Sequence, residues 1–155
     1  MPLTKTPICD LTKKAKNFVL ESTDNEMISL NSSKGKNGTL IMFICNHCPY
    51  VKSVIKEIVH DTNKLKKIEI NSIAIMSNDT DQYPEDSFAN MKKFSKKNNL
   101  NFPYLIDKDQ VVAKSYGAVC TPDFFGFNNN FELKYRGRIR ELKNLKAINI
   151  GDSDL

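Results

Sequence analysis

Apolar positions recur along this 155-residue chain with two different spacings, and their order predicts strands that alternate with helices. The apolar run at residues 39–44 is typical of a central strand covered on both faces. A helical pattern follows, in which one face carries Val51, Val54, Ile55, Ile58 and Leu65. The β-branched segment 68–76 then predicts a second strand and completes a β-α-β unit.

Weaker patterns before and after this unit predict the remaining elements. Residues 17–21 and 27–30 flank a polar turn and predict a hairpin, as do residues 123–127 and 131–135. Pro84, followed by Glu85 and Asp86, marks the start of a helix that runs to about residue 98. We also expect a short strand at 102–106, a short helix at 109–116 that ends at Gly117, and at most three helical turns within 141–154.

Strands that alternate with helices in this order predict an α/β fold, an α/β/α sandwich around a mixed central sheet. We expect a single domain over 1–155, with a surface arm at 1–17, a core at 18–139 and a C-terminal extension at 140–155. Such sheets place their chemistry beyond the carboxyl ends of the strands. Residues 45–49 occupy that position after the first central strand.

Composition narrows the classes of function. Apolar residues make up 40% and charged residues 26%, as in a soluble globular protein, and the net charge is +5. The positive charge comes from lysines spread along the chain without an aromatic stripe, which favours solubility over nucleic-acid binding. No run approaches the ~20 apolar residues of a membrane span, and the first twenty residues hold no secretory signal. We therefore expect a cytoplasmic protein that binds neither nucleic acid nor membrane.

The candidate chemistry lies in Cys45 and Cys48, which are separated by Asn46 and His47 and followed by Pro49. A Cys-x-x-Cys pair at the start of a helix should place both sulfurs on the first turn, close enough to bridge. The helix N-terminus and a protonated His47 would lower the pKa of Cys45 from about 8.5 into the ~3.5–7.5 range.

Cysteines in this pattern have two other uses in proteins, as inert buried thiols and as zinc ligands. Inert buried thiols need no special surroundings, whereas a zinc site needs four ligands, usually as two spaced pairs. The remaining candidates for such ligands are isolated in the sequence: His47, His60, Cys9 and Cys120. Redox chemistry is therefore favoured, with no metal and no cofactor expected.

Several segments, in order, resemble the thioredoxin-like fold. More narrowly, they are similar to its peroxiredoxin-like branch, the redoxin or alkyl hydroperoxide reductase/thiol-specific antioxidant family. The similarity is carried by residues 43–52 (FICNHCPYVK), 77–79 (SND), 83–87 (YPEDS), 102–105 (FPYL), 116–125 (YGAVCTPDFF) and 135–139 (YRGRI).

The resemblance implies an oxidoreductase with antioxidant-type chemistry, in which Cys45 attacks and Cys48 resolves. Pro122 would be a cis-proline facing the pair, and Thr121 would offer its backbone to an extended substrate. Cys120 would lie near the pair, either as a third redox thiol or as a small buried hydrophobic residue. The implied partners are a disulfide-containing protein or a small disulfide, together with a thiol reductant.

The sequence also departs from the family pattern. Thioredoxin carries Trp and a buried acid where this chain has Ile44 and Thr39, so the deprotonation of Cys48 lacks its usual helper. Neither cysteine has the Pro and Thr spacing of typical peroxiredoxins, although Arg136 or Arg138 is a candidate for stabilising peroxide oxygens.

Two alternatives to disulfide exchange stay open: a thiol-dependent peroxidase that reduces hydroperoxides, and a non-catalytic thioredoxin-like binding module. The short segment after residue 139 is less than the final helix of the family. It would leave apolar sheet surface for a second subunit, so a homodimer is a further expectation.

Overall fold

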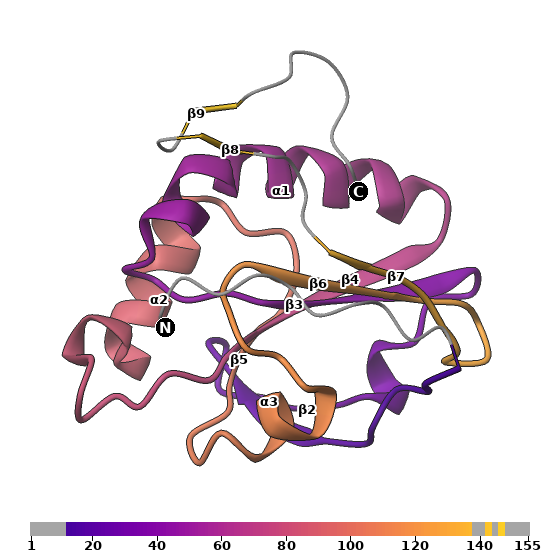
Figure 1. The fold of residues 1–155 in the computed structure, drawn as a ribbon, viewed down its shortest axis with the longest axis horizontal. Coiled ribbons are helices and arrows are strands. Elements are labelled where there is room, and N and C mark those ends of the chain that lie inside the picture. The colour runs from indigo at the N-terminus through magenta and orange to yellow at the C-terminus, as the bar shows by residue number, and fades with distance from the viewer. Residues whose placement is uncertain (1–11, 138–141, 144–145, 148–155) are drawn as a thin grey trace.

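The computed structural model describes residues 12–137, 142–143 and 146–147. Seven strands form one mixed sheet in the order β2-β1-β5-β4-β3-β6-β7 (Figure 1). Their bounds are β1 Val19–Ser22, β2 Met27–Ser29, β3 Gly38–Phe43, β4 Ile70–Met76, β5 Tyr104–Ile106, β6 Asp123–Phe127 and β7 Leu133–Gly137. The segments predicted as strands in this part of the chain all form strands.

Strand β3 lies at the centre of the sheet because all of its side chains can be buried. It pairs in parallel with β4 and antiparallel with β6, and each of its residues is buried. Alternate side chains enter two separate cores, so that Met42 faces one and Ile41 the other. This is the covered strand that the apolar run at 39–44 predicts.

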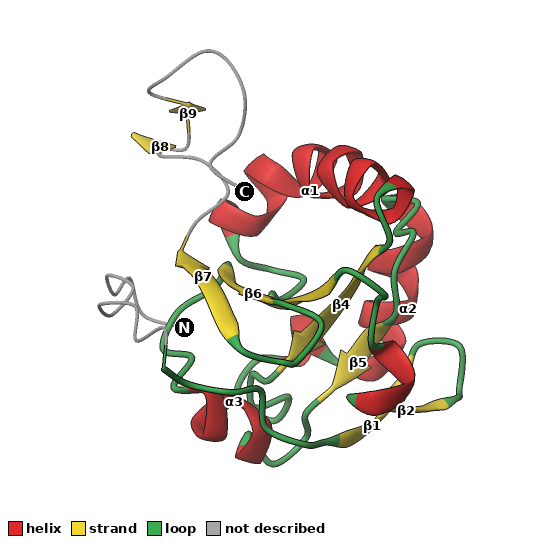
Figure 2. Ribbon diagram, turned by 90° about the vertical axis from the view of Figure 1, so that its right-hand side faces the viewer, coloured by secondary structure: helices red, strands yellow, loops and turns green. Residues whose placement is uncertain are grey.

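Helices cover both faces of the sheet, as Figure 2 shows. On one face, α1 (Pro49–Lys67) and α2 (Phe88–Lys97) pack over a core that includes Met42, Ile58 and Met91. On the other face, α3 (Val111–Tyr116) and the short helix η1 (Asn31–Ser33) lie over a core that includes Ile41 and Tyr116. The expected α/β/α sandwich with a mixed sheet is confirmed.

Two predicted helices differ from the observed elements. Pro84 begins a separate 3-10 turn, η2 (Pro84–Asp86), and α2 starts after it, where the Ser87 side chain caps the Asn90 N–H at 3.2 Å. The expected helical turns within 141–154 are wrong where the structure describes that segment. There, β8 (Leu142–Lys143) and β9 (Lys146–Ala147) form a two-stranded antiparallel sheet, in which the backbone of each strand is paired with the other instead of with its own next turn.

The end of the expected N-terminal arm is tied to the second hairpin. The Ala15 N–H donates to the Phe131 carbonyl at 2.9 Å, and the Tyr116 hydroxyl donates to the Lys16 carbonyl at 2.6 Å. Residues 1–11, including Cys9, lie outside the described residues. So do residues 138–141, where the predicted core ends and the predicted C-terminal extension begins. In the described part of the chain, none of the helices is both long and apolar enough to cross a bilayer.

Candidate active site

The loop that joins β3 to α1 holds the cysteine pair. Cys48 is the N-cap of α1, with φ −63° and ψ 121°, and Pro49 is the first helical residue. Cys45 lies before the helix, two positions after the end of β3. The expectation that both sulfurs lie on the first helical turn is therefore wrong. Proline favours the first helical position because it has no N–H to leave unpaired, so the helix begins after Cys48 and not at Cys45.

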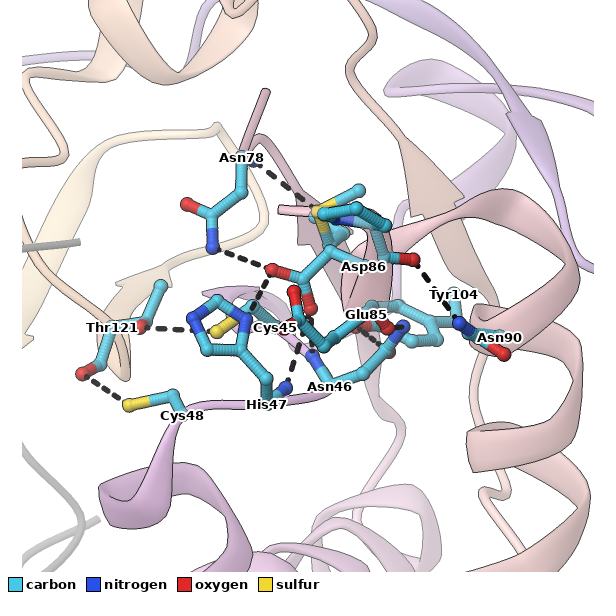
Figure 3. Close-up of polar contacts among 12 residues, drawn as sticks. Cys45, Asn46, His47, Cys48, Asn78, Glu85, Asp86, Asn90, Tyr104 and Thr121 are labelled. Carbon is cyan, nitrogen blue, oxygen red and sulfur yellow. Dashed lines mark hydrogen bonds and ion pairs between the residues drawn. The ribbon is translucent and has the colours of Figure 1, made fainter. Parts of the chain in front are cut away.

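The two cysteines also differ in their exposure. Cys45 is completely buried, whereas Cys48 is only partly buried. Thr121, in the turn before β6, contacts both sulfurs (Figure 3). Its hydroxyl lies 3.6 Å from the Cys45 Sγ, and its carbonyl oxygen accepts from the Cys48 thiol at 3.5 Å. The Thr121–Pro122 peptide bond is cis. The fold thus brings together residues 73 positions apart at one end of the sheet.

The electrostatics of the pair favour a thiolate on Cys48. A hydrogen bond from Cys45 lowers the pKa of Cys48 to about 5, with further lowering by Thr121 and by the backbone amides of Val51 and Tyr50, against the opposing effect of burial. The same hydrogen bond with Cys48 raises the pKa of Cys45, and burial raises it further. In the reduced pair the shared hydrogen bond thus favours the charge on Cys48, which differs from the expectation that the lowered pKa belongs to Cys45. The helix N-terminus stabilises the charge on the cysteine that caps it, which is Cys48.

A buried carboxylate holds the cysteine loop in place. Asp86, on η2, is fully buried and accepts hydrogen bonds on both oxygens. Its Oδ1 accepts from the backbone N–H groups of Asn46 and His47, at 2.7 and 3.3 Å. Its Oδ2 accepts from the Asn78 side chain at 2.8 Å and contacts Nδ1 of His47 (Figure 3). All four partners are nitrogen atoms, which fits an ionised, acceptor-only carboxylate.

The side chains of Asn46 and His47 are fixed by further contacts. The Tyr104 hydroxyl donates to Oδ1 of Asn46 at 2.8 Å, and Nδ2 of Asn46 donates to the Glu85 carbonyl at 3.1 Å. The imidazole of His47 stacks on the ring of Tyr83, with centroids 5.1 Å apart and an interplanar angle of 12°. The two residues between the cysteines therefore anchor the loop to η2 and β5.

Sequence reasoning identified Cys45, Cys48, Asn46, His47 and Thr121 but missed Asp86, Asn78 and Tyr104 as members of the site. It interpreted Asp86 as an acid in the first turn of a helix. A usable signal was present, because Asn78 and Asp86 follow β4, the parallel neighbour of β3. The carboxyl ends of parallel neighbours meet at the same edge of a sheet, so polar residues after both strands are expected to converge.

Three groups at this edge belong to the types that ligate metals in proteins. The Cys45 sulfur, a ring nitrogen of His47 and a carboxylate oxygen of Asp86 lie within 4.8 Å of one another. The Asp86 oxygens are, however, already the acceptors for four N–H groups. His47 and Asp86 therefore belong to a hydrogen-bonded network, and the Cys45 sulfur lies close to it without a hydrogen bond described to either.

Arg136 and Cys120, two further candidates from the sequence, are both held in the interior near the start of β6. Arg136 donates to the Asp123 carboxylate at 3.1 Å and to the Gly117 carbonyl at 2.7 Å, and it lies over the Phe125 ring. These contacts hold the guanidinium beside the start of β6. Among the described residues, its contacts do not include either sulfur of the pair. Cys120 is buried, as a small hydrophobic residue would be. His60 is exposed on α1, and Arg138 lies outside the described residues.

The fold and this pair of thiols define a class, the thioredoxin-like redox proteins. The thioredoxin domain of a thiol-disulfide oxidoreductase from Bacteroides vulgatus has the same fold, with a TM-score of 0.69 at 17% identity over 83% of this chain and 89% of that one. Residues 11–142 match the AhpC/TSA family. The chain belongs to that family.

Relatives of known name agree with this class. The chain is 31% identical over 122 residues to the thiol-disulfide oxidoreductase ResA of Bacillus thuringiensis subsp. konkukian, over 79% of this chain and 66% of ResA. It therefore spans just under two thirds of that relative. It is 27% identical over 128 residues to bcp of Coxiella burnetii, named as a peroxiredoxin, over 83% of this chain and 76% of bcp.

A closer structural match is an uncharacterized conserved protein from Geobacillus kaustophilus. The TM-score is 0.92 and the identity 41%, over 97% of this chain and 80% of that one. The support for a thioredoxin-like redox function comes from the named relatives and the family.

Proposed function

We propose that this protein is a thiol–disulfide oxidoreductase that cycles between a Cys45/Cys48 dithiol and a Cys45–Cys48 disulfide. The observation that carries the proposal is the pairing of two hydrogen-bonded thiols, one of which caps a helix and has its pKa lowered to about 5. A thiolate is the attacking species in disulfide exchange. The similarity to ResA supports the same chemistry.

The proposed order of the steps reverses the one that the family resemblance implies. Cys48 is partly exposed and favoured as a thiolate, so it attacks the substrate disulfide and forms the mixed disulfide. Cys45 is completely buried and favoured as a thiol, so it resolves that intermediate from inside the protein. Burial keeps Cys45 away from incoming disulfides, while its hydrogen bond with Cys48 keeps the two sulfurs in reach.

The substrate side of the site is the turn at Thr121. Its carbonyl oxygen lies beside the Cys48 sulfur, so a disulfide-bearing segment that reaches Cys48 passes alongside this backbone. We propose a disulfide-containing protein or a small disulfide as substrate, and a thiol reductant that returns the pair to the dithiol. Net reduction of this kind suits a reducing compartment such as the cytoplasm.

Trapping experiments test both the function and the order. The Cys45→Ser variant should accumulate a mixed disulfide on Cys48 with a disulfide substrate, seen as an added mass on that residue. The Cys48→Ser variant should form adducts slowly, because its remaining pair thiol is buried. The Cys120→Ser variant keeps both thiols of the pair and should form no persistent adduct.

The opposite pattern of trapping would restore Cys45 as the attacking residue. Adducts in neither variant, with protein and small disulfides alike, would refute disulfide exchange.

A second candidate function is reduction of hydroperoxides. The Cys48 thiolate would attack a peroxide oxygen to give a sulfenic acid and an alcohol or water, and Cys45 would condense with it to the disulfide and water. The helix-capping thiolate and the similarity to bcp favour this function. The engagement of Arg136 with Asp123 argues against a fast peroxidase. We expect hydrogen peroxide to be consumed no faster than by free cysteine; a much faster rate would make the peroxidase the better assignment.

A further inference from the structure

The second half of the proposed cycle requires a base, and this inference rests on that proposed function. Cys45 is completely buried, and burial disfavours its charged form, so it begins the resolving step as a thiol. It must lose its proton as it attacks, yet a buried thiol cannot pass that proton directly to water. The position six residues before it is Thr39, which cannot act as the base.

The loop between the cysteines supplies the missing group. A ring nitrogen of His47 lies within 4.8 Å of the Cys45 sulfur and of an Asp86 carboxylate oxygen. In Figure 3 one ring nitrogen of His47 faces Asp86 and the other lies on the side of Thr121, and the contact that joins Cys45 to Thr121 passes behind the ring. The His47 side chain is 26% exposed, whereas Asp86 is fully buried, so a proton accepted by the ring can leave to solvent.

The hydrogen bonds fix which nitrogen is available. Asp86 accepts only N–H groups at its other three contacts, and Nδ1 of His47 is its fourth partner. An ionised carboxylate accepts and does not donate, so Nδ1 must carry the hydrogen. In the neutral ring, Nε2 then carries the lone pair and can accept a proton. Stacking on Tyr83 holds the ring in this orientation.

We propose that His47 is the base that takes the proton of Cys45 during the resolving step, and that Asp86 is the positioning residue that sets its orientation and tautomer. Cys48 attacks as a thiolate and needs no base. Cys45 attacks as a thiol and needs His47, which Asp86 positions. This use of an imidazole and a buried carboxylate replaces the acid that thioredoxin carries near its pair.

The bonds and charges of the step balance. The Cys48 thiolate first attacks a disulfide RSSR′, which forms Cys48–S–S–R and releases R′S⁻ to be protonated from solvent. The Cys45 thiol then gives its proton to His47 while its sulfur attacks the Cys48 sulfur and breaks the bond to R. The released RS⁻ takes the proton from the His47 imidazolium and leaves as RSH. Two electrons pass from the dithiol to the substrate, and His47 ends neutral.

A two-phase assay separates the steps. All samples carry Cys9→Ser and Cys120→Ser so that only the pair reacts, and the reduced protein is mixed with 4,4′-dithiodipyridine, a neutral disulfide that releases one chromophore when Cys48 attacks and a second when Cys45 resolves. His47→Gln should leave the first release within twofold of the unsubstituted protein and slow the second at least tenfold, since general-base catalysis contributes about 10²–10⁴. The matched control is His60→Gln, which alters the other histidine of the chain and should change neither phase.

Further variants separate proton transfer from a structural effect. In His47→Ala, added imidazole should restore the second release in proportion to its concentration, which a misfolded site would not permit. Asp86→Asn should slow the second release more than the first. If His47→Gln resolves as fast as His60→Gln, or if both releases slow equally without rescue, His47 is not the base. If the unsubstituted protein itself gives no second release, the proposed function fails instead.

Discussion

The sulfur of Cys48 lies 3.5 Å from the backbone carbonyl oxygen of Thr121, a residue 73 positions further along the chain. This contact joins the N-terminus of α1 to the turn that precedes β6. It means that the proposed attacking thiol and the backbone beside which a substrate would lie are held by two different parts of the fold, a helix N-terminus and a turn. Reactivity at Cys48 therefore depends on the packing of β3 against β6 as well as on the helix.

The reactivity of Cys48 should depend on pH with an inflection at about 5. The thiolate is the reactive form, so alkylation by iodoacetamide should be constant above that value and fall about tenfold per pH unit below it. Cys45→Ala should move the inflection upward, because the hydrogen bond from Cys45 is the largest cause of the lowered pKa. An inflection near 8.5 in the unsubstituted protein would instead favour the non-catalytic binding module.

The same lowered pKa predicts a pH dependence of stability in the reduced protein. The folded pKa of Cys48 is about 5 against an ordinary value of 9.0, so the stabilisation is fully present above pH 9 and is lost as the pH falls through 5. The free energy of unfolding should therefore rise from pH 5 to pH 9 more steeply than in Cys48→Ser. Urea unfolding of the two reduced proteins at several pH values measures the difference. Parallel curves would show that Cys48 is not a thiolate in the folded state.

Removal of the Thr121 hydroxyl should affect the resolving cysteine. That hydroxyl lies 3.6 Å from the Cys45 sulfur and lowers its pKa. Thr121→Val should raise the pKa of Cys45 further and slow the second thiol release about fivefold, the effect of a hydrogen bond of about 1 kcal/mol. Thr121→Ser retains the hydroxyl and serves as the matched control. Equal rates in the two variants would show that the contact has no role in resolution.

Loss of the Asp86 carboxylate should destabilise the whole protein. Asp86→Ala leaves the N–H groups of Asn46 and His47 and the Asn78 side chain without their acceptor. Buried unpaired polar groups are costly, so we expect a loss of about 3 kcal/mol in the free energy of unfolding, measured with urea. Asp81→Ala, at an exposed position of the same segment, should change stability by less than about 0.5 kcal/mol. Similar small losses in both variants would contradict the anchoring role of Asp86.

Breaking the ion pair between Arg136 and Asp123 on one side only should lower the free energy of unfolding. The Asp123 side chain is fully buried and that of Arg136 is 6% exposed. Burial raises the pKa of Asp123, and Arg136 lowers it. Arg136→Met should therefore raise the pKa of Asp123 further and destabilise the fold by about 3–5 kcal/mol at pH 7, where the carboxylate is charged when unfolded.

The destabilisation in Arg136→Met should shrink as the pH falls from 7 towards the ordinary value of 3.8, because the raised pKa means that Asp123 is protonated in both folded proteins before that value is reached. The double variant Arg136→Met/Asp123→Leu removes both charges and should recover most of the loss at pH 7. A double variant no more stable than the single one would show that packing, and not charge, is what Arg136 supplies.

Local patterns predicted much of the fold because local physics sets it. The run at 39–44 became β3, and the apolar face that begins at Val51 became α1. Gly117 ends α3 in the left-handed region at φ 70°, which costs glycine little. The helix predicted to start at Pro84 begins four residues later, at Phe88, because Ser87 is the better cap and the Asp86 carboxylate is buried as the acceptor of N–H groups.

The sequence alone determined that two cysteines sit at the junction of a buried strand and a helix, with Asn46 and His47 between them. Only the tertiary structure decided which cysteine caps the helix and which is buried, and so which is favoured as the thiolate. Spacing says how far apart two residues are along the chain, whereas a pKa depends on the burial and hydrogen bonds that distant segments provide. Asp86 contacts the two residues between the cysteines from 39 and 40 positions away, and Thr121 contacts the cysteines themselves from 73 and 76 positions away; no local pattern encodes that meeting.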